Sequence, residues 1–132
     1  MDFQIIYLTL EQILVIHQDQ IERYGGSHGL RDLALLESAI FRPQSSFSSK
    51  EFYKTIFDKT AALMHSLILN HPFIDGNKRT GIVSALVFLE LNGFRLEVGT
   101  KELIKTALKI ESKKLNLENV VKWLESNSKK NS

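Results

Sequence analysis

The sequence predicts an all-α protein: a single-domain bundle of about six helices around a central buried helix. Its 132 residues, 43% of them hydrophobic, are enough for one core and leave no room for a second domain. Apolar residues recur at three- and four-residue spacing in several segments, and glycine, proline or asparagine separates those segments. Residues 50–70 are apolar on more than one side, as expected of a helix that other helices surround.

The first helix is expected at residues 9–24. Thr9 and Gln12 have the spacing of a capping box, in which each side chain bonds the backbone N–H of the other, and two glycines follow the periodic run. Before this helix, residues 5–7 are compatible with a strand fragment or with an extended segment that packs on the core.

A shorter helix is expected after the glycine-rich segment 25–32. Asp32 is its predicted N-cap, and the Arg-Pro pair at 42–43 is its predicted end, because a residue before proline avoids helical backbone angles. A polar loop follows, in which Phe47 is expected to be buried. Ser49 is then the predicted cap of the central helix.

The C-terminal half holds the remaining predicted elements. These are a long helix at about 77–91 that ends at Asn92-Gly93, an extended segment at 94–98, and amphipathic helices near 101–112 and 117–126. The predicted domain spans residues 1–126. Residues 127–132 are expected to form a frayed, flexible polar tail.

Composition narrows the class of protein. A net charge of +2 and a pI near 8.9 are only mildly basic, so charge does not indicate nucleic-acid binding and no direct DNA binding is expected. The absence of cysteine excludes a disulfide framework and thiolate chemistry. The N-terminus lacks the features of a secretory signal, and no apolar stretch reaches the ~20 residues of a membrane span. A cytoplasmic protein without a membrane segment is expected.

The strongest functional signal is residues 71–79, His-Pro-Phe-Ile-Asp-Gly-Asn-Lys-Arg, hereafter the motif. His71 is its candidate base, because the unperturbed pKa of histidine lies near neutrality. Asp75 offers a hard oxygen ligand, which Mg²⁺ typically takes together with phosphate oxygens. Gly76 allows a tight turn into the next helix, whose unpaired N–H groups bind anions. Phe73 is expected to anchor the turn in the core.

Two cations at this helix start also favour a phosphate site. Asn77, Lys78 and Arg79 place an amide and two positive charges in the first turn, where positive charge opposes the helix dipole by a few tenths of a kcal/mol to about 1 kcal/mol. A bound anion would offset this conflict. The composition also fits an ordinary turn, with Asp75 or Asn77 as a helix cap and both cations solvated, so both interpretations stay open at this point.

The order of residues in the motif resembles the signature of the Fic superfamily, all-helical proteins that transfer part of a nucleotide to a hydroxyl. Lys78 stands where the adenylyl-transferring members usually carry glycine, and with it the motif resembles the death-on-curing (Doc) branch. The resemblance covers about residues 1–125. Outside the motif it rests on segments 29–32, 35–39, 42–44 and 88–93.

This resemblance implies a toxin of a type II toxin–antitoxin system that uses Mg²⁺ and ATP. It implies that His71 is the base for a target hydroxyl and that Asp75 is the Mg²⁺ ligand. The implied nucleotide contacts are Gly76, Asn77, Lys78 and Arg79. In the Doc branch the γ-phosphate is moved to a threonine of elongation factor Tu, and a separate antitoxin with a flexible tail inhibits the toxin. No serine or threonine here has glutamate four residues on, so a self-inhibiting segment of the usual Fic type is not expected.

Two other functions remain open. An adenylyltransferase on the same fold is favoured by Pro72 and Gly76, which resemble the broader superfamily, whereas Ile82 replaces an arginine that such enzymes usually carry. A non-catalytic protein that binds RNA or the ribosome would use a lysine stripe at four-residue spacing. Its members are Lys101, Lys105, Lys109 and Lys113. The solvated face of an amphipathic helix is the stronger interpretation of this stripe. The role of segment 25–32 is left undetermined.

Overall fold

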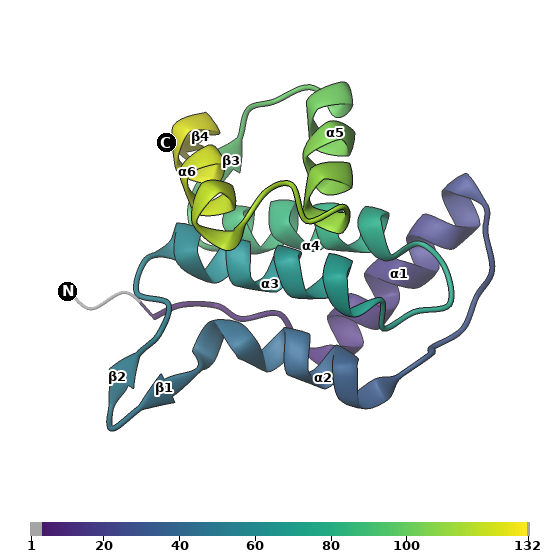
Figure 1. Cartoon of the computed structure of the whole chain (residues 1–132), viewed down its shortest axis with the longest axis horizontal. Helices are drawn as coiled ribbons and strands as arrows, with labels where there is room; N and C mark the ends of the chain where they lie inside the picture. Colours follow the sequence, from purple (N-terminus) through teal and green to yellow (C-terminus); the bar gives the residue numbers. More distant parts are fainter. Residues whose placement is uncertain (1–3, 132) are drawn as a thin grey trace.

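The computed structural model describes residues 4–131, and this part of the chain is built mainly from helices (Figure 1). Its α-helices are α1 (Leu10–Tyr24), α2 (Leu33–Phe41), α3 (Ile56–Asn70), α4 (Asn77–Leu91), α5 (Thr100–Glu111) and α6 (Leu117–Asn127), and a 3₁₀ helix, η1 (Arg42–Gln44), follows α2. The strands are β1 (Ser46–Phe47), β2 (Lys50–Glu51), β3 (Phe94–Leu96) and β4 (Ser128–Lys130). The prediction of an all-α, single-domain bundle of about six helices is confirmed. Within the described residues, no helix has both the length and the apolar character needed to cross a bilayer.

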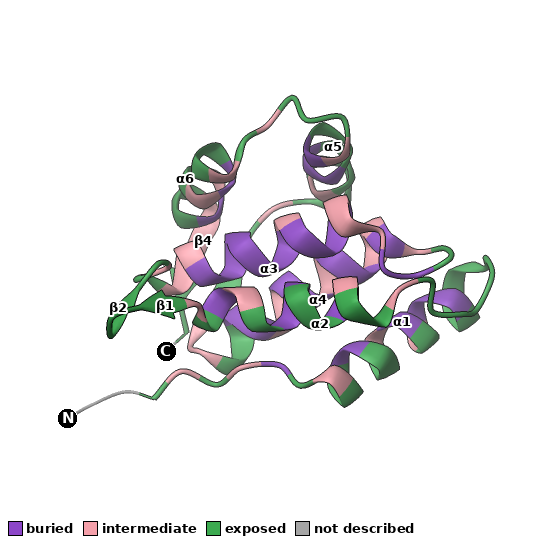
Figure 2. Ribbon diagram, turned by 60° about the horizontal axis from the view of Figure 1, so that its bottom comes forward, coloured by how far each residue is buried: buried purple, intermediate pink, exposed green. Residues whose placement is uncertain are grey.

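Helix α3 is the centre of the bundle, as predicted (Figure 2). Its buried positions lie all around the helix rather than along one face: Lys59, Thr60, Ala61, Ala62, Leu63, Met64, Ser66, Leu67 and Ile68. Helix α4 packs closely against it because position 81 is glycine. A Cβ at Gly81 would lie only 2.8 Å from Cγ1 of Ile68. A helix contacted on several sides does not need a polar face, which explains the sequence pattern.

The core has two parts on either side of α3. The first joins α3 and α4 to α1, α2 and the N-terminal lead-in, where Ile5 and Tyr7 pack on buried residues without forming a strand. The second joins α3 and α4 to α5 and α6. There Ile110 and Leu124 are fully buried, and the partly buried Trp123 packs against this part of the core.

The predicted starts of α1 and α2 are confirmed. Thr9 and Gln12 form the reciprocal capping box. The carboxylate of Asp32 accepts a hydrogen bond of 3.0 Å from the backbone N–H of Leu35. Both caps satisfy N–H groups that have no partner inside the helix, so local sequence is enough to determine these boundaries.

The predicted start of the central helix is wrong. Helix α3 begins at Ile56, not near residue 50. Thr55 and Asp58 form its capping box, with hydrogen bonds of 3.0 Å in both directions. Ser49 instead lies in the turn between β1 and β2, where its φ is 66°. The reciprocal cap leaves fewer helix N–H groups unpaired than a single serine would, and this favours the later start.

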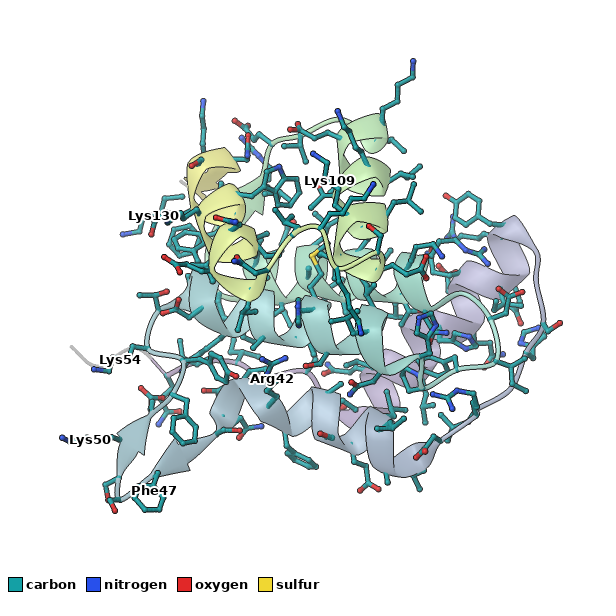
Figure 3. The ribbon with its side chains drawn as sticks, viewed as in Figure 1. Arg42, Phe47, Lys50, Lys54, Lys109 and Lys130 are labelled. Atoms are coloured by element: carbon teal, nitrogen blue, oxygen red, sulfur yellow. The ribbon has the colours of Figure 1, made fainter. Side chains whose placement is uncertain are left out.

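The β1–β2 hairpin projects from the bundle (Figure 3), and polar contacts hold its base. Phe47, which the sequence predicts to be buried, is 72% exposed. The almost completely buried ammonium of Lys59 donates to Glu51 Oε1, at 3.0 Å, and to the carbonyl of Tyr53. Arg42 donates to the Tyr53 hydroxyl at 2.7 Å. The hairpin is attached to the bundle through the charged side chains of Lys59 and Arg42, and Phe47 does not enter the core.

The C-terminal tail does not have the predicted frayed structure at residues 128–130. These residues form β4 and pair antiparallel with β3, so that prediction is wrong for them. Strand β3 offers a row of backbone groups that needs partners. Glu97, which directly follows β3, supports the pairing through an ion pair with Lys129 of β4 (3.3 Å), and it also pairs with Arg95 of its own strand (2.7 Å). Ser132 lies outside the described residues.

Candidate active site

The motif, residues 71–79, connects α3 to α4. His71 ends α3 with left-handed backbone angles (φ 48°, ψ 55°), since its neighbour Pro72 disfavours helical angles. Gly76, with φ 77°, is the N-cap of α4. Left-handed angles suit glycine but are strained for most other residues, so the backbone of His71 must be held by its surroundings. The side chain of His71 is 44% exposed and can be reached by a substrate group.

The upstream loop, residues 25–32, supplies this support. Arg31 donates from Nε to the carbonyl of His71 (2.5 Å) and from Nη2 to the carbonyl of Asn70 (2.6 Å). The backbone N–H groups of Arg31 and Asp32 both donate to the carbonyl of Pro72, at 2.7 and 3.0 Å. These four bonds hold the strained turn from one side. The loop whose role the sequence leaves undetermined therefore holds the backbone of the candidate base.

Phe73 and Asn77 form the interior of the motif. Phe73 is 2% exposed, which confirms its predicted role as the apolar anchor. The Asn77 side chain accepts from the N–H of Phe73 and donates to its carbonyl, both at 2.9 Å. Asn77 itself is 8% exposed. Its amide is engaged within the motif and shapes the turn, and a contact of Asn77 with phosphate stays a prediction.

His17 supports the motif from α1. Its ring stacks on Phe73 with centroids 3.8 Å apart, and its Nε2 donates to the carbonyl oxygen of Asp75 at 2.7 Å. Burial lowers the pKa of His17, so the imidazole is neutral near pH 7. The sequence contained an unused signal for this residue. His17 lies four residues from both Ile13 and Ile21 and so shares the apolar face of α1.

Asp75 presents an ionised carboxylate at the surface of the motif. Its Oδ2 accepts from the N–H of Ser27 (3.1 Å) and its Oδ1 from the N–H of Gly76 (2.8 Å). These bonds, with a contribution from the charge of Arg79, lower the pKa of Asp75. An exposed carboxylate with remaining lone pairs fits Mg²⁺, which takes one or two protein carboxylates beside phosphate oxygens and water. Within residues 4–131, no three acidic, histidine or cysteine side chains cluster into an all-protein metal cage.

Arg79 connects α4 to the end of α1, next to Asp75. Its Nη1 donates to the carbonyl of Gln20 and its Nη2 to the carbonyl of Gly25, both at 3.0 Å. Gly26 lies against both charged groups. A Cβ there would be 2.6 Å from Asp75 Oδ2 and 3.2 Å from Arg79 Nη2. The glycine-rich loop thus approaches Asp75 and Arg79 so closely that a side chain at position 26 would collide with them. The implied contact of Arg79 with phosphate stays a prediction.

A cavity of about 240 Å³ adjoins Arg79, between α1, α4 and α5. Its lining is mainly apolar and includes Tyr24, Ile82 and Leu103. Ile82 is the position at which adenylyl-transferring Fic proteins usually carry arginine. Its side chain contributes apolar surface here, so the guanidinium of Arg79 is the cation at this cavity.

The start of α4 combines unpaired N–H groups with the side chain of Lys78. The first N–H groups of a helix have no intrahelical partner and form an anion site. Lys78 donates from Nζ to Glu111 Oε2 at 3.0 Å, and His71 Nε2 lies 3.6 Å from the same oxygen. Sequence reasoning missed Glu111. Its signal is an acidic residue at the C-terminal end of α5, where the helix dipole disfavours negative charge.

All predicted site residues lie in the motif, at the end of α3, in the turn and in the first turn of α4, and three other segments support them. The predicted residues are His71, Asp75, Gly76, Asn77, Lys78 and Arg79; the supporting residues that the sequence did not reveal are His17, Ser27, Arg31 and Glu111. The arrangement places a candidate base, an ionised carboxylate and a cationic helix N-terminus within one short segment. That set of groups suits transfer of a phosphate-containing group to a hydroxyl.

Comparison with known proteins identifies the family of the chain. Residues 7–89 match the Fic/DOC family, and the chain belongs to that family. The chain is 44% identical over 73 residues to the toxin Doc of Mycolicibacterium smegmatis, a match that covers 55% of this chain and 56% of that toxin. It is 33% identical over 90 residues to the protein kinase doc of Escherichia phage P1, with 68% of this chain and 71% of that protein covered. The resemblance to the Doc branch is confirmed, and the first match spans little more than half the length of the toxin.

Proposed function

We propose that the protein is the toxin of a type II toxin–antitoxin system and that it transfers the γ-phosphate of ATP to a protein hydroxyl. The observation that carries this proposal is the hydrogen-bonded motif, which presents an accessible histidine, an ionised carboxylate and a cationic helix N-terminus within nine residues. The relatives named as a toxin and as a protein kinase support the same activity.

In the proposed reaction, His71 takes the proton of the substrate hydroxyl while the hydroxyl oxygen bonds to the γ-phosphorus. The bond from that phosphorus to the oxygen that bridges it to the β-phosphorus breaks, and ADP leaves with the electron pair. Help from a general base is worth ~10²–10⁴ in rate, or about 3–5 kcal/mol of barrier. Asp75 would hold Mg²⁺, which would supply positive charge to the phosphates. Lys78, Arg79 and the first N–H groups of α4 bind the phosphate oxygens.

Adenylyl transfer on the same fold is the second candidate, because Pro72 and Gly76 match the broader superfamily. Two observations favour γ-transfer over it. Ile82 lines an apolar cavity in place of a second phosphate-binding arginine. Lys78 places a charged side chain where glycine would leave room for the α-phosphate.

The proposed target is a threonine of elongation factor Tu, whose phosphorylation in the cytoplasm arrests translation. The proposed inhibitor is a small antitoxin that binds in trans through a flexible tail. Similarity to a protein named as a toxin supports the antitoxin, and the resemblance to the Doc branch is the reason for proposing this target. The absence of a Ser/Thr-x-x-x-Glu sequence in the chain is consistent with inhibition by a separate protein.

The proposed reaction is tested with ATP labelled at either the α- or the γ-phosphate. The full chain is incubated with Mg²⁺ and a cell lysate, beside His71→Ala and the matched control His65→Gln, which changes a histidine of α3 outside the motif. Label from the γ-phosphate alone, lost only in His71→Ala, is the expected result. Label from the α-phosphate would indicate adenylyl transfer. Toxicity that survives in His71→Ala without any label transfer would favour a non-catalytic RNA- or ribosome-binding protein.

The direction of nucleotide binding is tested by Lys78→Gly. If the Lys78 side chain forces the triphosphate to present its γ-phosphate, the variant should gain adenylyl transfer and lose γ-transfer. Unchanged γ-transfer in Lys78→Gly would contradict this explanation, while leaving the kinase activity itself established.

A further inference from the structure

Glu111 brings a carboxylate from α5 to two side chains of the motif, those of His71 and Lys78. Its Oε2 lies 3.0 Å from Lys78 Nζ and 3.6 Å from His71 Nε2. The side chains of His71, Lys78 and Glu111 are 44%, 40% and 30% exposed, so the cluster is at the surface and can rearrange. In Figure 1 the C-terminal end of α5 lies near the start of α4, which explains how residues far apart in sequence meet here.

The position of Glu111 is unfavourable for α5 itself. A carboxylate at the C-terminal end of a helix faces the negative end of the helix dipole. The ion pair with Lys78 offsets this conflict in the free protein. The first turn of α4 has the opposite conflict, because Lys78 is a cation at a positive helix end. Each charge therefore satisfies the other, and an anion that binds Lys78 more strongly will separate them.

A triphosphate is such an anion. It carries several negative charges, and it would also engage the unpaired N–H groups of α4, which the single carboxylate of Glu111 does not. Once phosphate takes Lys78, the nearest hydrogen-bond donor for Glu111 is the imidazole of His71, 3.6 Å away. A shift of about half an ångström closes that distance to a hydrogen bond.

We propose that Glu111 is a positioning residue that exchanges partners when nucleotide binds. In the free protein it holds Lys78. With nucleotide bound, it accepts a hydrogen bond from Nε2–H of His71 and leaves Nδ1 unprotonated to take the proton of the hydroxyl. A base held by a third group in this way is the general arrangement of activated histidines. This inference rests on the proposed phosphotransfer.

The exchange predicts opposite effects on binding and on turnover. Glu111→Gln keeps the shape of the side chain but removes its charge. ATP binding should become about two- to five-fold tighter, because an exposed ion pair no longer competes for Lys78. The kcat should fall about ten- to one-hundred-fold, because the imidazole is no longer oriented. A residue with a purely structural role would not tighten ATP binding.

The experiment measures the Kd of ATP by calorimetry with Mg²⁺ present, and kcat and KM for γ-phosphate transfer, on the full chain. Glu118→Gln is the matched control, since Glu118 pairs with Lys122 on the exposed face of α6. Thermal unfolding verifies that each variant folds. In a Lys78→Met background, Glu111→Gln should no longer tighten ATP binding, because the cation for which the two anions compete is gone.

Unchanged or weaker ATP binding in Glu111→Gln would overturn the partner exchange, as would an unchanged kcat in an active enzyme. If the wild-type chain binds ATP but transfers no γ-phosphate, the proposed function fails. The Kd values then decide the inference, because tighter ATP binding in Glu111→Gln would still show that Glu111 and ATP compete for Lys78. Absence of ATP binding in every variant would refute both.

Discussion

Asn77→Ala tests whether the motif depends on the hydrogen bonds inside it. The change removes two buried bonds of 2.9 Å and leaves the N–H and carbonyl of Phe73 without these partners. An unsatisfied buried polar group costs about 1–3 kcal/mol, so the loss of both bonds should lower the free energy of unfolding by about 2–6 kcal/mol. With an unfolding entropy of ~2.1 cal/mol/K per residue, 132 residues lose about 3.5 °C of Tm per kcal/mol. The expected decrease in Tm is about 7–21 °C.

Thermal unfolding followed by circular dichroism measures this decrease. Asn119→Ala, on the exposed face of α6, is the matched control and should stay within about 0.5 kcal/mol of the wild type. Phosphotransfer by Asn77→Ala should also fall, because the backbone that carries the base loses its support. A variant with unchanged Tm but weaker ATP binding would refute this reasoning, since Asn77 would then serve the phosphate and not the turn.

Two further predictions concern packing and pH. Gly81→Ala should destabilise the fold by about 1–3 kcal/mol, offset by up to ~1 kcal/mol of helix propensity, because the added Cβ would lie 2.8 Å from Ile68 Cγ1. Urea unfolding measures the net loss. Stability should also decrease as the pH falls from 7 to 5, since burial lowers the pKa of His17 and of His65 and the unfolded chain binds their protons first, below about pH 6.5. Urea unfolding at pH 7.5, 6.5 and 5.5 measures this slope.

Each of these predictions has its own control. Gly99→Ala adds a Cβ that meets nothing within 4 Å, so it should be neutral, and a neutral Gly81→Ala would contradict the close packing of α3 and α4. His65→Gln should reduce the pH slope by removing one titrating group, by at most about 1.4 kcal/mol per pH unit. Stability that is constant between pH 7 and 5 would show that neither imidazole is desolvated.

Local sequence predicted a helix start correctly where only one residue could serve as the N-cap. The predicted caps Thr9 and Asp32 are confirmed, because the hydrogen bonds that define each cap join residues only three positions apart. The predicted start of the central helix is too early because Ser49 and Thr55 both precede apolar runs and both can serve as an N-cap. Asp58, three residues after Thr55, was the available signal for the true cap.

Contacts between distant segments account for the wrong predictions. Residues 128–130 are polar and carry no strand pattern of their own, yet β3 offers them a backbone partner. Phe47 has the composition of a core residue, but the hairpin that carries it is attached by the buried charge of Lys59. In both cases the deciding partner is remote or charged, and hydrophobic periodicity contains no information about such partners.

The sequence by itself determined the helical class, the burial of α3 and the chemistry of the motif, because periodicity, proline and glycine act over a few residues. Only the tertiary structure decided which side chains hold the backbone of the motif and which one pairs with its positive charge. The contacts of the motif with His17, Arg31 and Glu111 join residues 58, 40 and 33 positions apart. A helical pattern specifies which face is buried but not which side chain will lie opposite it, so these residues emerge only when α1, the upstream loop and α5 are packed around the turn.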